Sequence, residues 1–129
     1  MASFARLGPG RCGQAQRRLV EAMRTHPELV AGEGRACTEL MRAMKGRAVV
    51  KTGAEAVFVG TLPERGLGIA LKIADGGTRG AEAAITALML HLGLLEQGDP
   101  VVRKYLADPL LNWRGLATGE SRRAEGFPG

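Results

Sequence analysis

The chain has 129 residues, which limits it to one domain and is long enough for a hydrophobic core. Hydrophobic residues make up 45% of the sequence but aromatic residues only 4%, so aliphatic side chains must fill that core. The formal net charge of +5 is scattered rather than clustered, which argues against a nucleic-acid partner. No apolar run reaches membrane-spanning length and residues 1–13 lack the apolar core of a signal peptide, so we expect no membrane partner and a cytoplasmic location.

Two helices are expected in the first third of the chain, after a flexible segment at residues 1–13. Apolar residues recur at helical spacing in residues 14–24 and again in residues 36–44. Pro27 ends the first helix, because the residue before a proline avoids the helical region. Residues 28–35 are then predicted to form a loop.

The two cysteines, Cys12 and Cys37, form neither a zinc-binding pattern nor a disulfide framework, so no metal-binding residue is predicted. Cys37 falls on the apolar face of the second expected helix, where a free buried thiol is the usual interpretation.

Residues 47–60 have the pattern of a β-hairpin, around which the rest of the chain is organised. An apolar run carries Lys51 into a turn of small residues that ends at Glu55, and a second β-rich run follows. Because side chains alternate along a strand, Val49, Lys51 and Gly53 share one face. An ammonium beside a glycine could handle a carboxylate, but the local pattern alone favours a solvated lysine at the end of a strand.

A third strand and a long helix follow the hairpin. Apolar residues alternate with small ones over residues 67–73, which predicts the strand. A turn at Asp75 leads into a helix over residues 79–92 that Thr78 caps. We expect Asp75 and Arg79 to fix that turn.

The last part of the chain is predicted to hold a short helix over residues 99–107 and a hairpin-like edge strand over residues 110–121, with Trp113 packed at its start. Residues 122–129 have the composition of a disordered tail. Three consecutive strands with short links predict an α/β fold of the α+β type. Its largely antiparallel sheet is expected to be covered by helices on both faces.

Several short motifs are more specific than their periodicity. Residues 26–35, HPELVAGEGR, closely resemble a segment of the L-asparaginase II family, the group typified by the thermolabile rhizobial enzyme. Each motif alone is weak, but together they form a specific resemblance over residues 17–122. The further matching pieces are Cys37-Thr38, Lys51-Thr52-Gly53-Ala54-Glu55, GIALKI at residues 68–73, Asp75-Gly76, and Asn112-Trp113 with Gly119.

This resemblance implies the C-terminal part of a fold similar to serine β-lactamases and glutaminases, in which a K-T-G motif on the edge strand lines the active-site cleft. Lys51-Thr52-Gly53 matches that motif, so the resemblance makes Lys51 catalytic. It makes the residues that follow, Thr52, Gly53, Ala54 and Glu55, substrate-binding. The implied activity is that of an amidohydrolase converting L-asparagine to L-aspartate and ammonia.

The departures from the family pattern limit that implication. No S-x-x-K motif occurs, since Arg6 stands three residues after Ser3, and Ala124 three after Ser121. The family's zinc is bound by cysteine and lysine in an N-terminal part that this sequence lacks, so no cofactor is expected in this chain. Residues 14–121 are expected to be the C-terminal part of an asparaginase II domain, inactive alone. The alternative is a non-catalytic module or truncated product that associates with a separate N-terminal half.

The segment from Gly32 to Arg35 allows two interpretations. Arg35 could face a substrate carboxylate, with Gly32 and Glu33 beside it. Glu33 and Arg35 could instead pair with each other at the start of the second helix, and this structural role is favoured. These residues, with Asp75 and Arg79, are expected to surround and support the residues that contact substrate, without contacting it themselves. A split fold exposes apolar surface, so we also expect a homodimer or association through an exposed sheet surface.

Overall fold

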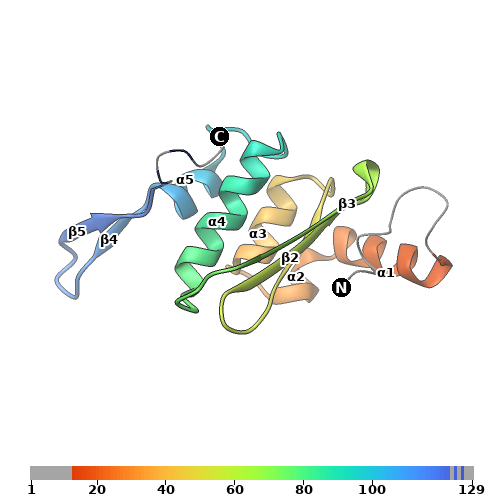
Figure 1. Ribbon diagram of the computed structural model, residues 1–129, viewed down its shortest axis with the longest axis horizontal. Coiled ribbons are helices and arrows are strands. Elements are labelled where there is room, and N and C mark those ends of the chain that lie inside the picture. The colour runs from red at the N-terminus through yellow and green to blue at the C-terminus, as the bar shows by residue number, and fades with distance from the viewer. Residues whose placement is uncertain (1–12, 123, 125, 127–129) are drawn as a thin grey trace.

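A sheet of three antiparallel strands lies at the centre of the computed structural model, which describes residues 13–122, 124 and 126 (Figure 1). The strands lie in the order β1-β2-β3, and β4 and β5 form a separate two-stranded sheet. The elements are α1 (Gln14–Thr25), α2 (Pro27–Ala31), α3 (Ala36–Ala43), β1 (Val49–Thr52), β2 (Val57–Leu62), the short 3₁₀ helix η1 (Pro63–Arg65), β3 (Leu67–Lys72), α4 (Thr78–His91), α5 (Pro100–Leu106), β4 (Pro109–Leu111) and β5 (Ala117–Glu120). This confirms the predicted α+β class and antiparallel pairing.

The predicted flexible start (residues 1–13) and disordered tail (residues 122–129) fall mostly outside the described residues. Of the first segment only Gly13 is described, as the N-cap of α1. Those two predictions therefore stay predictions.

A short helix, α2, replaces the first part of the loop expected at residues 28–35. Pro27 stands at the start of α2, where its fixed φ suits a helix and its missing N–H is not needed. Gly32 ends the helix with a φ of 90°, a conformation that favours glycine. The sequence interpretation treated Pro27 only as the end of the first helix, although a proline is equally suited to begin the next one.

α3 confirms the second predicted helix, and its apolar face contributes much of the core. Cys37, Leu40, Met41 and Met44, which recur at helical spacing, are all buried. Gly46 follows the helix with a φ of 74° and ends it as expected.

The register of the sheet places Lys51 opposite Val59, and Val59 opposite Ala70. The strands cross α3 and α4 (Figure 1), and on this helix-facing side Val50 and Phe58 are buried. On the opposite side Val59 is half-buried and Ala70 is exposed. Helical cover is thus confirmed for this face, whereas on the opposite face the buried paired residues are Val49 and Thr61 at one end of the β1–β2 pair. The other face of β3 carries small or charged side chains, which offer little apolar area to a covering layer.

The turn into α4 depends on Asp75, as predicted, because its Oδ1 accepts a hydrogen bond of 2.7 Å from the Gly77 N–H. Gly77 is the N-cap of α4, and Thr78, the predicted cap, is the first helical residue. Because Gly77 has no side chain, α4 begins without a side-chain cap hydrogen bond. Asp99 and Pro100 take the predicted N-cap and first position of α5.

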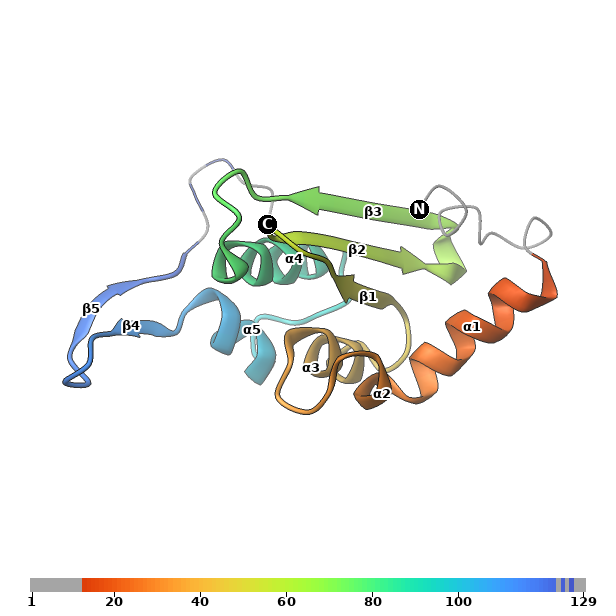
Figure 2. The ribbon, with the colours of Figure 1, turned by 90° about the horizontal axis from the view of Figure 1, so that it is seen from below.

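β4 and β5 form a hairpin that projects away from the rest of the molecule (Figure 2). The hairpin was predicted, but its position as an edge of the main sheet was wrong. Trp113, expected to pack, is fully exposed in the loop between the two strands. The sequence of residues 110–121 indicated a hairpin but carries no information about which sheet its strands join.

Gly60 tests the register of the central sheet. An added Cβ there would lie 3.0 Å from the Val49 carbonyl oxygen and 3.0 Å from the Ile69 side chain. We expect Gly60→Ala to lower the free energy of unfolding by about 1–3 kcal/mol, because the neighbouring backbone cannot move away freely. Gly98→Ala is the matched control, since its added Cβ meets nothing within 4 Å. Urea unfolding measures both, and equal midpoints would contradict the register.

Candidate active site

Lys51 and Thr52 end β1, an outer strand of the three-stranded sheet, and Gly53 follows directly. The functional roles of this K-T-G segment stay predictions. The half-buried Lys51 ammonium donates a hydrogen bond of 2.8 Å to the Thr52 carbonyl oxygen. The Gly53 N–H donates to the Val57 carbonyl at 2.7 Å and closes the hairpin. Lys51 is therefore held against its own strand and is not a freely solvated side chain.

The outer side of β1 contacts α3 through a thiol. The Thr52 N–H donates a hydrogen bond of 3.2 Å to Cys37 Sγ. Burial raises the pKa of the Cys37 thiol, and the Thr52 N–H, Lys51 and Arg35 oppose that rise only in part. Cys37 is thus a protonated, buried thiol that serves as an acceptor. The sequence predicted the burial of Cys37 but not this contact, because no pattern in residues 38–51 indicates that β1 packs against α3.

Glu33 pairs with Arg42 and not with Arg35, so the favoured structural interpretation was wrong about the partner. The Arg42 guanidinium donates two hydrogen bonds to the Glu33 carboxylate, at 2.6 and 2.7 Å. These bonds hold the pKa of Glu33 below its ordinary value. Gly32 has a structural role as well, because its carbonyl accepts a 2.7 Å hydrogen bond from Thr38 Oγ1.

Arg35 is therefore not the partner of Glu33. It is the N-cap of α3, is exposed, and stands two residues before Cys37. Among the described residues its guanidinium makes no hydrogen bond and no ion pair. Both cations, Lys51 and Arg35, lie near enough to Cys37 to act on its thiol electrostatically.

The turn after Gly53 is strained, with Ala54 and Glu55 exposed and Ala56 buried. The Val57 N–H donates to the Ala54 carbonyl at 3.3 Å, and the two central residues, Glu55 and Ala56, have φ of 54° and 57°. This is the pattern of a type I′ turn, which glycine or asparagine normally fills. The Glu55 carboxylate lies 3.8 Å from Lys72 Nζ, which also donates to the Glu55 carbonyl. Substrate contacts of Ala54 and Glu55 stay predictions.

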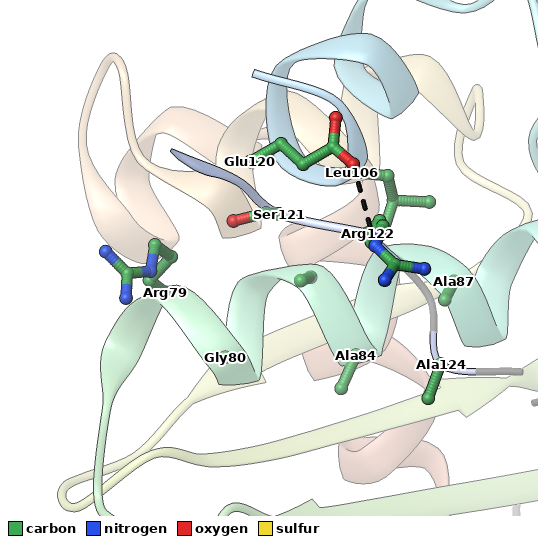
Figure 3. Close-up of a pocket in the computed structure, with 10 residues that line it drawn as sticks. Arg79, Gly80, Ala84, Ala87, Leu106, Glu120, Ser121, Arg122 and Ala124 are labelled. Atoms are coloured by element: carbon green, nitrogen blue, oxygen red, sulfur yellow. Dashed lines mark ion pairs between the residues drawn. The ribbon is translucent and has the colours of Figure 1, made fainter. Parts of the chain in front are cut away.

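Arg79 lies apart from the K-T-G segment. It lines a groove of about 350 Å³ between α4 and a wall formed by residues 120–122 and 124, to which neither Lys51 nor its neighbours contribute (Figure 3). The turn into α4 is fixed by Asp75 through Gly77, as described above, without an ion pair to Arg79 among the described residues.

A second polar cluster, which the sequence did not reveal, lies between α3, α4 and α5. The Glu39 carboxylate accepts hydrogen bonds from Lys104 Nζ at 2.7 Å and from the Tyr105 hydroxyl at 2.6 Å. Burial acts to raise the pKa of Glu39, but these two donors leave it below its ordinary value. The pKa of Tyr105 is raised, first by burial and then by its bond to Glu39. No local motif joins these residues, because they come from separate helices.

Glu82 of α4 borders this cluster without an ion pair to any described residue. Burial raises the pKa of its carboxyl, although Arg35 and Lys104 favour the charged form. No hydrogen bond reaches the Glu82 carboxylate within the part of the chain that the structure describes. Glu82 thus interacts electrostatically both with Arg35 and with the cluster of Glu39 and Lys104.

The described residues do not fit a metal centre. They contain no group of three or more His, Cys, Asp or Glu side chains placed to hold a metal ion. The thiol of Cys37 is protonated and already accepts the Thr52 N–H, so it is not prepared as a ligand. We therefore derive no step through the zinc of the family.

The sequence was also compared with models of protein families. The sequence model of the family described as L-asparaginase II matches residues 1–123. The chain belongs to the L-asparaginase II family. This confirms the resemblance drawn from the motifs, and the family is one of amidohydrolases.

A search of curated proteins finds no match to this L-asparaginase II chain. None of its described helices is long and apolar enough to cross a membrane.

The pH dependence of stability tests the position of Glu82. An unfolded chain releases this proton near the ordinary value of 4.5, whereas the folded chain retains it to higher pH. Folding is therefore weakened as the pH rises from about 4.5 through the raised value. We expect Glu82→Gln to be more stable than the parent near pH 7 and equal to it near pH 4, by urea unfolding.

The control for Glu82→Gln is Glu96→Gln, which removes an exposed carboxylate in the loop before α5. It should leave the difference between the two pH values unchanged. A Glu82→Gln variant that is less stable near pH 7 would show that Arg35 and Lys104 outweigh burial at this site.

Proposed function

We propose that this chain forms the Lys51 side of the active site of an L-asparagine amidohydrolase, which produces L-aspartate and ammonia. The observation that carries the proposal is the Lys51 ammonium, held at the end of β1 by the Thr52 carbonyl in a chain of the L-asparaginase II family. A fixed cation at a strand end stabilises negative charge that develops on an attacked amide.

Lys51, and not the strand backbone, is the more suitable electrostatic group. The Thr52 N–H is occupied by Cys37 and the Gly53 N–H by Val57. A donor that already has a partner is not free to receive a developing oxyanion. The Lys51 ammonium, and not the backbone that follows it, is therefore the group that we propose to stabilise the negative charge on the attacked amide.

The proposed reaction also needs a nucleophile. Cys37 is 1% exposed and Ser121 lacks the S-x-x-K spacing, so neither is suited to attack an amide. We propose that a serine from another part of the enzyme attacks the side-chain amide. The C–N bond then breaks, ammonia leaves, and water releases L-aspartate from the acyl-enzyme. The alternative, a non-catalytic module that associates with a separate N-terminal half, predicts binding to that half without turnover.

Ammonia release from L-asparagine tests the proposal directly. The purified chain is assayed alone and after mixing with a matching N-terminal half that carries S-x-x-K. Activity only in the mixture would support the proposed division of roles. Activity of the chain alone would mean that it holds its own nucleophile, and a folded mixture without activity would favour the non-catalytic module.

Lys51→Met should lower turnover in the active mixture by about 100-fold or more, because the variant keeps the length of the side chain but removes its charge. Lys45→Asn is the matched control. It removes a cation beyond the other end of α3, at a φ of 52° that asparagine tolerates. Equal loss in both variants would indicate an effect of net charge and refute a specific role for Lys51.

We further propose that Arg35, whose guanidinium makes no hydrogen bond or ion pair with the described residues, binds the α-carboxylate of the substrate. Charge-assisted hydrogen bonds of this kind contribute about 1.5–3 kcal/mol, so Arg35→Gln should raise KM for L-asparagine about tenfold or more. Hydrolysis of 3-aminopropanamide, which lacks the α-carboxylate, should be unaffected by the same change. A similar loss for both substrates would show that Arg35 has only a structural role.

A further inference from the structure

Three carboxylates lie near the first turn of α3, and two of them are already occupied by side chains of the protein. Glu33 accepts two hydrogen bonds from a guanidinium of α3. Glu39 accepts hydrogen bonds from an ammonium and a hydroxyl of α5. The third carboxylate, that of Glu82 on α4, accepts no hydrogen bond and forms no ion pair within the part of the chain that the structure describes. Glu82 is therefore the carboxylate of this region that is available to a ligand.

The environment of Glu82 is unfavourable for folding. The residue is half-buried, and burial raises the pKa of its carboxyl although Arg35 and Lys104 favour the charged form. A partly buried charge without a hydrogen-bonded partner lowers the free energy of unfolding. Titratable groups in this condition gather at functional sites, where a ligand supplies the missing partner. The structure thus favours a cationic ligand group at Glu82.

The two cations of the protein that act on Glu82 do not take that place. Lys104 lies on α5, which packs against α4, but its Nζ donates to both carboxylate oxygens of Glu39 at 2.7 Å. Arg35 is the N-cap of α3, and it interacts with Glu82 electrostatically without forming an ion pair among the described residues. Two opposite charges that act on each other without contact are both available to one ligand.

A free α-amino acid has the complementary pair of charges, because its carboxylate and its ammonium are attached to the same Cα. The planar guanidinium of Arg35 suits the carboxylate, and the Glu82 carboxylate suits the ammonium. Lys51 lies in the same region, since Lys51 and Arg35 both act on the Cys37 thiol electrostatically. The side-chain amide of an amino acid held by its α-groups is therefore directed to the part of the structure that contains Lys51.

We propose that Glu82 binds the α-ammonium of the substrate while Arg35 binds its α-carboxylate, so that the site selects free α-amino acid amides. The inference rests on the amidohydrolase function proposed above, because it places the α-groups of that substrate. An asparagine inside a peptide has neither charge, and N-acylation removes the ammonium alone. Both kinds of compound leave Glu82 without a partner and are rejected.

Equilibrium binding tests the pair without requiring turnover. The chain is mixed with the matching N-terminal half, in which alanine replaces the serine of S-x-x-K, and is titrated calorimetrically with three ligands. These are L-asparagine, succinamate, which lacks the α-ammonium, and 3-aminopropanamide, which lacks the α-carboxylate. L-Asparagine should bind about tenfold or more tightly than either analogue, because each analogue loses one charge-assisted hydrogen bond. Equal affinities for L-asparagine and succinamate, or no binding of L-asparagine, would overturn the proposal.

Two variants assign the charges to their residues. Glu82→Gln should weaken binding of L-asparagine about tenfold or more, and it should leave succinamate at least as tightly bound, since a repelling negative charge is removed. Arg35→Gln should give the opposite pattern, with 3-aminopropanamide unaffected or bound more tightly. A Glu82→Gln variant that binds L-asparagine like the parent, or that loses L-asparagine and succinamate equally, would overturn the role of Glu82.

Glu96→Gln is the matched control, because it removes an exposed carboxylate in the loop before α5. It should leave all three affinities unchanged, and a loss equal to that of Glu82→Gln would indicate an effect of net charge and overturn the proposal. Far-ultraviolet circular dichroism verifies that each variant is folded. If Glu82→Gln fails to fold, the three ligands on the parent and Glu82→Asp, which keeps the charge and should keep the preference over succinamate, still decide the question.

Turnover by the mixture that retains the serine separates this inference from the proposed function. Turnover of L-asparagine with a KM that Glu82→Gln leaves unchanged would overturn the contact to Glu82 and leave the amidohydrolase in place. Absence of turnover, together with the binding pattern described above, would refute the proposed reaction and support the amino acid site.

Discussion

One hydrogen bond, from the Thr52 N–H to the sulfur of Cys37, fixes the relation between α3 and β1 on which the proposed site depends. The same helix buries Leu40 and Met41 in the core, so it cannot shift without disturbing the sheet. Loss of the sulfur would leave a part-buried N–H unpaired, at a cost of about 1–3 kcal/mol. The positions of Arg35 and Lys51 relative to each other follow from this contact and from the core behind it.

Local chemistry predicted most of the fold. The helical spacing of α3 and the alternation in β3 identified both elements to within a residue or two. The unpredicted features have tertiary causes: α2 depends on where the chain turns after Pro27, and the separate sheet of β4 and β5 depends on the absence of a neighbour for them among the described residues. Periodicity reports which side of a strand is apolar, and it does not report what lies opposite.

Only the part of the candidate site whose residues are adjacent in the sequence could be predicted. Lys51, Thr52 and Gly53 form one segment, so a motif could identify them and place them on a strand at the side of the sheet. Glu39, Lys104 and Glu82 come from three helices, and their proximity depends on helix packing that no short spacing encodes. The partner of Glu33 was mispredicted for the same reason. The sequence suggested the nearby Arg35, but the helical geometry of α3 brings the more distant Arg42 to the Glu33 carboxylate.

The interactions around Thr52 also bear on resistance to aggregation. An outermost strand with unpaired backbone groups is a template on which other chains add as strands. At Thr52 the N–H is taken by Cys37 and the carbonyl by the Lys51 ammonium, so both groups are already satisfied within the chain. β3, on the far side of the sheet, ends in the charged Lys72. Growth of fibrils by strand addition is therefore opposed at both sides of the sheet, by saturation at one and by charge at the other.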